Sequence, residues 1–264
     1  MFDVQSRGDQ RKININKVGV KNLHYPIVVL DKKNRTQPTV ATINMYADLA
    51  HHLKGTHMSR FLEVFDQYSS DLSMQNFLNM LDSIKQSLDA REAYAEIAFP
   101  YFMEKAAPVS GAKSMLDYIC RFIGEVVGDE RKFHVGIEVP ITTVCPCSKE
   151  ISERGAHNQR GVVRVKLFFE QFFWIEDVIT LIEASASSEV FSLLKREDEK
   201  FLTERAFDHP MFVEDVVREV TQKLEACGIF PWFSVEAENF ESIHNHNAYA
   251  YVERGQEMDR AVKS

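Results

Sequence analysis

The residues best suited to chemistry in this sequence are two cysteines that stand two positions apart. Cys145 and Cys147 follow a predicted strand, and His157 comes shortly after them. On an extended backbone a Cys-x-Cys pair places both sulfur atoms on one side of the chain, and Pro146 stiffens the link. Thiolate and imidazole are ligands that zinc and iron accept. The segment therefore predicts a metal site, with inert thiols at a strand end as the alternative.

A second polar cluster lies near the C-terminus, where Glu241, His244 and His246 fall within the segment Glu238–Asn247. A turn uses Asn and Ser, but it has no need of two imidazoles and two glutamates. Together with a cysteine, such groups make a closed metal site, or an open one if water takes one position. The open form provides a hydroxide nucleophile near neutral pH, and a second thiol beside it can transfer protons.

Several charged residues have a functional and a purely structural interpretation. Glu214 stands near the start of a predicted helix, where it either compensates the helix dipole or accepts two hydrogen bonds from a guanine edge. Glu199 belongs to an acidic group in the predicted loop Lys195–Arg205, most of which we expect to be solvated. Cations that could neutralise phosphates, each of them by itself more simply a solvated charge, are Lys54, His57, Arg60, Lys149, Arg160 and Lys195.

The elements that position these residues follow from hydrophobic periodicity. Alternating apolar residues predict strands at 40–49, 93–99, 116–122, 135–141, 163–169, 233–237 and 248–252. Helical spacing predicts helices at 74–88, behind the capping candidates Ser70 and Asp71, at 175–182, and at 212–224 before Gly228. Both halves show two strands, two helical segments and two strands, and both contain G-x-H-x-x-R, at Gly55–Arg60 and Gly155–Arg160. This order favours a tandem duplication over coincidence.

The composition and net charge of the chain exclude several classes of protein. The 264 residues include 39 acidic and 31 basic side chains, for a formal net charge of −8. An acidic protein is a poor binder of nucleic acid polymers, although one small anionic ligand remains compatible. Four cysteines are too few for a disulfide scaffold, and no apolar run approaches the roughly 20 residues of a membrane span. No signal sequence is evident, so we expect a cytoplasmic protein without membrane contact.

Five separated motifs resemble GTP cyclohydrolase IB, the prokaryotic type, and the resemblance extends over nearly the whole chain. The motifs are Lys54–Phe61, Cys145–Glu150, Gly155–Arg160, Ser185–Val190 and Glu241–Asn247. The resemblance implies an α+β tunnelling fold of two tandem modules, each an antiparallel four-stranded sheet with two helices. The modules would span residues 1–129 and 130–264, and the subunit would assemble as a homotetramer.

The resemblance also implies a reaction and residue roles. GTP would be hydrolysed at its imidazole ring to 7,8-dihydroneopterin triphosphate and formate, the first step of folate biosynthesis. The implied metal, manganese or zinc, would be held by Cys145, His157, Glu199 and His244, with Cys147 as the proton-transfer thiol, although the two cysteines could exchange roles. Glu214 would anchor guanine, and Glu241 or His246 would complete the pocket. The alternatives are a nitrile reductase with a cysteine nucleophile and a nicotinamide cofactor, and a non-catalytic metal-binding protein.

Overall fold

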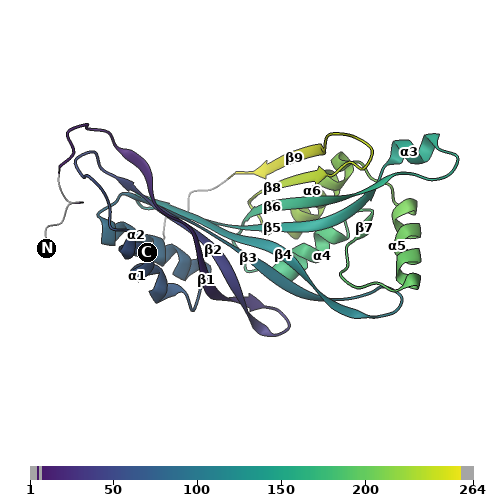
Figure 1. The fold of residues 1–264 in the computed structure, drawn as a ribbon, viewed down its shortest axis with the longest axis horizontal. Helices are drawn as coiled ribbons and strands as arrows, with labels where there is room; N and C mark the ends of the chain where they lie inside the picture. Colours follow the sequence, from purple (N-terminus) through teal and green to yellow (C-terminus); the bar gives the residue numbers. More distant parts are fainter. Residues whose placement is uncertain (1–4, 6–7, 257–264) are drawn as a thin grey trace. The chain divides into compact units, whose positions relative to one another are not determined.

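The computed structural model describes residue 5 and residues 8–256 (Figure 1). The elements in chain order are β1 (Ile15–Asp31), β2 (Arg35–Leu49), α1 (Met58–Tyr68), α2 (Met74–Leu88), β3 (Glu92–Ala106), β4 (Lys113–Val127), β5 (Glu130–Val144), α3 (Pro146–Ile151), β6 (Asn158–Phe168), α4 (Ile175–Glu183), β7 (Ser188–Glu189), α5 (Arg196–Asp208), α6 (Val213–Cys227), β8 (Trp232–Asn239) and β9 (Ala248–Gly255). Hydrogen bonding orders the strands β1-β2-β3-β4-β5-β6-β8-β9, and β7 pairs with β5. None of the described helices is long and apolar enough to cross a membrane.

The described chain divides into two compact units. Unit 1 contains the residues up to Pro100 together with Arg121–Val135, and unit 2 contains Tyr101–Cys120 and residues 136–256. Strands β3, β4 and β5 therefore contribute residues to both units.

Unit 1 is built on the long antiparallel pair β1 and β2, whose register runs from Asp31↔Arg35 to Ile15↔Leu49. Alternation along β2 buries one face, with Ile43 and Met45 fully inaccessible, and α1 and α2 pack against each other and against these strands. The predicted helix 74–88 is confirmed as α2. Its cap, however, is Ser73, whose side chain accepts a hydrogen bond from the Asn76 amide, rather than Ser70 or Asp71.

Unit 2 carries the antiparallel strands β6, β8 and β9, with Val163 opposite Ala237 and Ala237 opposite Ala250. Helix α6 packs on β8 and β9, and α4 lies beside α6. The apolar stripe of α6 is buried in this unit, and the helix ends at Gly228 in the left-handed conformation that favours glycine. The predicted strands and the helices at 175–182 and 212–224 are confirmed, as is the α+β class.

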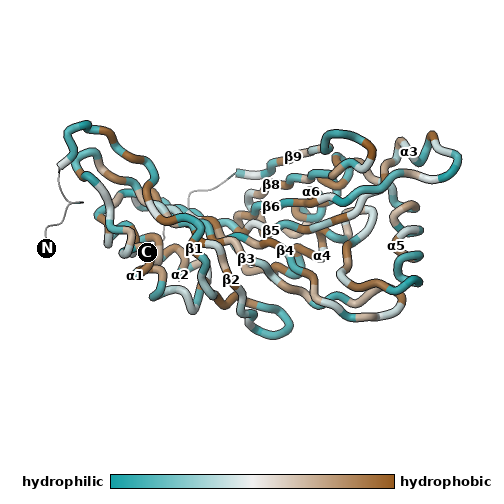
Figure 2. The backbone as a smooth tube through the Cα atoms, viewed as in Figure 1, coloured by the Kyte–Doolittle hydropathy of each residue, from teal (hydrophilic) through white to brown (hydrophobic). Residues whose placement is uncertain are grey.

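Three local expectations are wrong. Residues 196–208, predicted as a loop, form helix α5, which buries only Asp198 and Ala206 and so lacks an apolar stripe; Figure 2 draws it largely in hydrophilic teal. Cys147 lies within helix α3 instead of extended backbone. The two G-x-H-x-x-R segments also differ, since Arg60 lies in helix α1 and Arg160 lies in strand β6.

Gly161 on β6 lies against the Asn239 side chain and the Glu238 backbone of the neighbouring strand β8. A Cβ atom there would lie 2.7 Å from Asn239 Oδ1 and 2.9 Å from the Glu238 carbonyl oxygen. We expect Gly161→Ala to lower the free energy of unfolding by about 1–3 kcal/mol, because overpacking forces this backbone to shift. Chemical denaturation measures the change. Gly8→Ala, whose Cβ atom would lie 4.0 Å from the His52 carbonyl oxygen, is the control, and equal stability of the two variants would contradict this packing.

Candidate functional site

The main chain of Val144 and Cys145, where β5 ends, is hydrogen-bonded to three other segments of unit 2. The Val144 amide donates to Ser187 Oγ at 3.2 Å, and the Val144 carbonyl accepts from the Met211 amide at 3.0 Å. The Cys145 amide donates to the His157 carbonyl at 3.1 Å. These bonds bring the segment before α6 and the segment before β6 to the thiol of Cys145.

Cys145 and Cys147 occupy different environments at the start of α3. Cys145 is the N-cap, half-buried, and its sulfur accepts from the Ser148 amide at 3.5 Å, while Pro146 takes the first helical position that suits it. Cys147 is exposed, and both cysteines are unbridged thiols. Because the chain turns into a helix here, the strand alternation that would have placed both sulfurs on one side does not apply.

A cavity of about 370 Å³ brings together three of the predicted site residues. Cys145 reaches it from the start of α3, Glu214 from the first turn of α6, and Glu241 from the β8–β9 connection. The other lining residues are Gln159, Met211, Phe212, Val213, Asn239, Ala248 and Tyr249. We call this the Cys145 cavity.

Glu214 is the acidic residue of the α6 first turn that faces the Cys145 cavity. Its neighbour Asp215 takes the capping role, because Asp215 Oδ2 accepts from the Phe212 amide at 3.1 Å. The bond from Met211 to Val144 fixes the approach to this turn. A carboxylate held in this way has two oxygens that can accept a pair of adjacent donors.

His157 is oriented by a chain of two buried polar side chains. Gln159 Nε2 donates to Thr143 Oγ1 at 2.9 Å, which leaves Gln159 Oε1 as the acceptor facing His157 Nδ1 at 3.0 Å. His157 Nδ1 therefore carries the proton, and Nε2 keeps its lone pair for a ligand or a proton. Glu241 Oε2 lies 3.9 Å from the same Nδ1.

The connection between β8 and β9 presents the remaining predicted residues beside His157. The His157 and His244 rings lie 6.3 Å apart between centroids, and His244 stacks on His246 at 5.1 Å. Glu238 accepts from Asn247 Nδ2 at 2.8 Å, and this bond, followed by one from Arg164, holds the pKa of Glu238 below its ordinary value. The ionised Glu238 thus links β8 to the end of the connection, at Asn247.

Glu199 and Arg160 line a different cavity, of about 290 Å³, which we call the Glu199 cavity. Asn158 and Arg160 border this cavity whereas Gln159 borders the Cys145 cavity, as expected for successive side chains of a strand. The structure therefore does not bring Glu199 into the group formed by Cys145, His157 and His244.

The other residues proposed to bind phosphate lie in both units, and two of them donate to backbone carbonyls. Lys149 Nζ donates to the Phe207 carbonyl and lies 4.3 Å from the centre of the Phe207 ring. Lys54, His57 and Arg60 belong to unit 1, where His57 is the N-cap of α1 and Arg60 donates to the Ser87 carbonyl at 2.6 Å.

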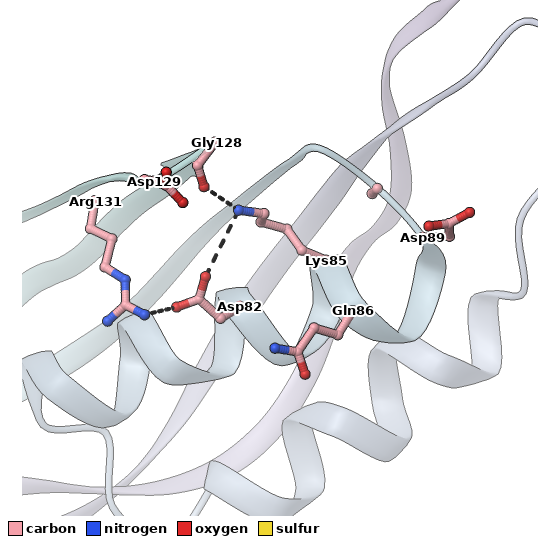
Figure 3. Close-up of a pocket in the computed structure, with 8 residues that line it drawn as sticks. Asp82, Lys85, Gln86, Asp89, Gly128, Asp129 and Arg131 are labelled. Carbon is pink, nitrogen blue, oxygen red and sulfur yellow. Dashed lines mark hydrogen bonds and ion pairs between the residues drawn. The ribbon is translucent and has the colours of Figure 1, made fainter.

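A further cavity, of about 790 Å³, lies in unit 1 and contains none of the predicted site residues. Figure 3 shows its two cations, Lys85 and Arg131, directed at Asp82, and Lys85 also donates to the Gly128 carbonyl. Both cations that line this cavity are therefore paired within unit 1.

The donor types around His157 suit a divalent metal, although no three of them converge. Within residues 8–256, no group of three His, Cys, Asp or Glu side chains is close enough to hold an ion. A thiol, an imidazole nitrogen with its lone pair and carboxylates are nevertheless the donors that zinc accepts. At the Cys145 cavity, Asn239 Oδ1 is buried and has no hydrogen-bond partner in the part of the chain that the structure describes, which marks an additional polar group in the wall.

Sequence reasoning missed Thr143, Gln159, Met211, Asn239 and Tyr249, which border or support the Cys145 cavity. One signal was available for Gln159, because it stands two positions after His157 and a strand places such residues on one face. The others come from segments that only the tertiary structure brings together.

Gln159 makes the tautomer of His157 testable by NMR. In the metal-free protein at mildly alkaline pH, ¹⁵N imidazole spectra should show His157 predominantly protonated at Nδ1. Gln159→Leu removes the acceptor, and we expect the Nε2-protonated form to become at least comparably populated. His209, whose Nδ1 lies 3.0 Å from the Arg205 carbonyl, should be unchanged and serves as the control. A wild-type His157 protonated at Nε2 would contradict this hydrogen-bond chain.

Comparison with solved structures identifies the fold. Uricase from Arthrobacter globiformis aligns with a TM-score of 0.55 at 11% identity, covering 94% of this chain and 96% of that one. Urate oxidase from Bacillus sp. TB-90 aligns with a TM-score of 0.54 at 7% identity, over 92% of this chain and all of that one. The fold is therefore the tunnelling fold, as expected, and at these identities the likeness concerns the fold alone.

Sequence comparison identifies the family. A family model described as "Type I GTP cyclohydrolase folE2" matches residues 1–250. The GTP cyclohydrolase FolE2 of Syntrophus aciditrophicus is 59% identical over 96% of this chain and 100% of its own length. That of Geobacter metallireducens is 56% identical over 98% of each chain. These names confirm the resemblance to a GTP cyclohydrolase but carry the designation FolE2 rather than IB. The chain belongs to the type I GTP cyclohydrolase FolE2 family.

Proposed function

We propose that this protein opens the imidazole ring of GTP by hydrolysis at the Cys145 cavity, releasing formate and giving 7,8-dihydroneopterin triphosphate. By its family the protein is a GTP cyclohydrolase acting in the first step of folate biosynthesis. The main support for placing the reaction there is that Cys145, Glu214 and Glu241, from three separate segments, line one cavity. The finer designation IB rests on the five sequence motifs.

Glu214 is the proposed guanine anchor. The N1–H and the exocyclic amino group of guanine are adjacent donors, and an ionised carboxylate can accept both. Support comes from the position of Glu214 on the cavity wall and from the capping role of Asp215, which holds the turn in place. Phe212 and Tyr249 border the same cavity and offer aromatic faces to the base.

The proposed metal ligands are Cys145, His157, Glu199 and His244, with manganese or zinc as the ion. Such an ion, when bound, lowers the pKa of a coordinated water and so provides a hydroxide nucleophile near neutral pH. The cavity position of Cys145 and the lone pair assigned to His157 Nε2 support these two ligands. Glu199 reaches the group only if its helix or the ligands rearrange.

Proton transfer and pocket closure are assigned to the remaining polar residues. Cys147, exposed and unbridged, is the proposed thiol that protonates a ring nitrogen as the ring bond breaks. Glu241, 3.9 Å from His157, or His246 completes the pocket. The proposed phosphate contacts are Lys54, His57, Arg60, Lys149 and Arg160, of which Arg160 lines the Glu199 cavity.

At the level of assembly, we propose two modules, residues 1–129 and 130–264, in a subunit that forms a cytoplasmic homotetramer. The repeated element order supports this division, since β4 ends at Val127 and β5 begins at Glu130. A nucleotide bound by local cations and one carboxylate is compatible with the net charge of −8.

Turnover of GTP by the metal-reconstituted protein tests the proposed function. We expect formate and, after oxidation, a fluorescent pterin when manganese or zinc is present, loss of both products on chelation, and recovery when the metal is restored. Boiled protein and metal salt alone are the controls. Stoichiometric metal without GTP turnover would indicate a metal-binding protein, and metal-independent reduction of a nitrile with a nicotinamide cofactor would indicate a reductase; either result would overturn the proposal.

Glu214→Gln tests the guanine anchor. Replacing the carboxylate by an amide removes one charge-assisted acceptor, and we expect kcat/KM for GTP to fall by about 10- to 150-fold, equivalent to about 1.5–3 kcal/mol. Metal content should remain that of the wild type. Glu219→Gln, on the same helix but paired with Lys223, is the matched control. Loss of bound metal in Glu214→Gln would instead make Glu214 a ligand.

A further inference from the structure

Helix α5 is attached to unit 2 mainly through polar contacts. Only Asp198 and Ala206 of its thirteen residues are buried, while Phe201 and Phe207 remain 42% and 39% exposed. A helix with so little apolar burial gains little from the hydrophobic effect. Its position must therefore come from specific hydrogen bonds and ion pairs.

Asp198 makes the densest set of these contacts. Its side chain is fully inaccessible to solvent. Oδ1 accepts from the amides of Val109 and Ser110, both at 2.9 Å. Oδ2 accepts from Ser110 Oγ at 2.6 Å and from the Lys195 amide at 2.8 Å. One carboxylate thus joins the start of α5 to the turn between β3 and β4.

The other polar contacts of α5 lie toward its C-terminal end. Arg205 pairs with Glu189 of β7 at 2.9 Å, and Lys149 donates to the Phe207 carbonyl. Neither contact fixes the first turn, where Glu199 is adjacent to Asp198 and its amide bonds to the Lys195 carbonyl at 3.0 Å. The first turn therefore depends on Asp198.

We propose that Asp198 is a positioning residue, which holds the first turn of α5 against the β3–β4 turn and thereby places Glu199 in its cavity. A buried carboxylate is costly unless its oxygens are satisfied, and here four donors satisfy them. Since Asp198 and Glu199 share a backbone segment, release of one displaces the other. The proposal deepens the proposed function, on which the ligand role of Glu199 rests.

Three variants separate this role from general destabilisation. Asp198→Asn removes the charge and converts one oxygen into a donor. Ser110→Ala removes a single donor and leaves the carboxylate in place, so it gives a milder test if Asp198→Asn does not fold. Glu197→Gln makes the same chemical change as an amide substitution at the preceding, exposed position and is the matched control.

Hydrogen exchange of the full-length protein is the readout that does not require activity. In Asp198→Asn we expect amides of residues 199–204 to exchange about tenfold faster or more, with amides of α6 unchanged. Ser110→Ala should shift the same amides by a smaller factor, and Glu197→Gln should not. Unchanged exchange of α5 in both Asp198→Asn and Ser110→Ala would overturn the proposal.

A double-mutant comparison with Glu199→Gln links Asp198 to the site. Because Glu199 lies in its own cavity, outside the Cys145 cavity, release of its turn in Asp198→Asn should change the affinity for manganese about tenfold or more and change kcat for GTP, with no further effect in the Glu199→Gln background. Equal changes in both backgrounds would overturn the link. If the wild-type protein does not turn over GTP, the proposed function fails, while exchange and manganese affinity still decide the role of Asp198.

Discussion

The candidate site depends on the hydrogen bonds made by the main chain of Val144 and Cys145. Their two amides and the Val144 carbonyl bind Ser187, His157 and Met211, which come from three separate segments of the sequence. Without these bonds, the end of β5 would no longer be held against the segment before α6, whereas its relation to β6 is also set by the pairing of the two strands in the sheet. Main-chain geometry therefore sets the backbone positions of Cys145, Glu214 and His157, and Gln159 additionally orients the His157 ring.

Much of the fold was predictable from the sequence because unit 2 and α2 follow simple periodicities. Strand β6 alternates Val163, Val165 and Leu167 with polar residues, and α6 carries a regular apolar stripe. Helix α5 was not predicted for the opposite reason, since it has only two buried residues and one of them is a carboxylate. The sequence flagged the acidic cluster but could not show which member is buried, because the four donors to Asp198 include two backbone amides from a distant turn.

The site was predictable in its residue types and less so in its geometry. Cys145, His157, Glu241 and Glu214 stood out by type and spacing, and the structure groups them around one cavity and the adjacent imidazole. The Cys-x-Cys pair illustrates what spacing leaves undetermined, because alternation holds only if the strand continues, and here Pro146 begins a helix. The roles of Gln159 and Thr143 were not predicted because they depend on two successive side-chain hydrogen bonds, from His157 to Gln159 and from Gln159 to Thr143.

The sparse apolar contact of α5 sets it apart from the rest of unit 2 in its response to temperature and salt. Detachment of this helix would expose little new apolar surface, so it would carry only a small change in heat capacity. Its equilibrium would therefore vary gently with temperature while the core of the unit follows a strongly curved stability profile. Dissolved ions, which screen the half-buried Arg205–Glu189 contact, would act on this helix more than on the packed interior. Ionic strength is thus the solution condition that distinguishes the attachment of α5 from the stability of the core.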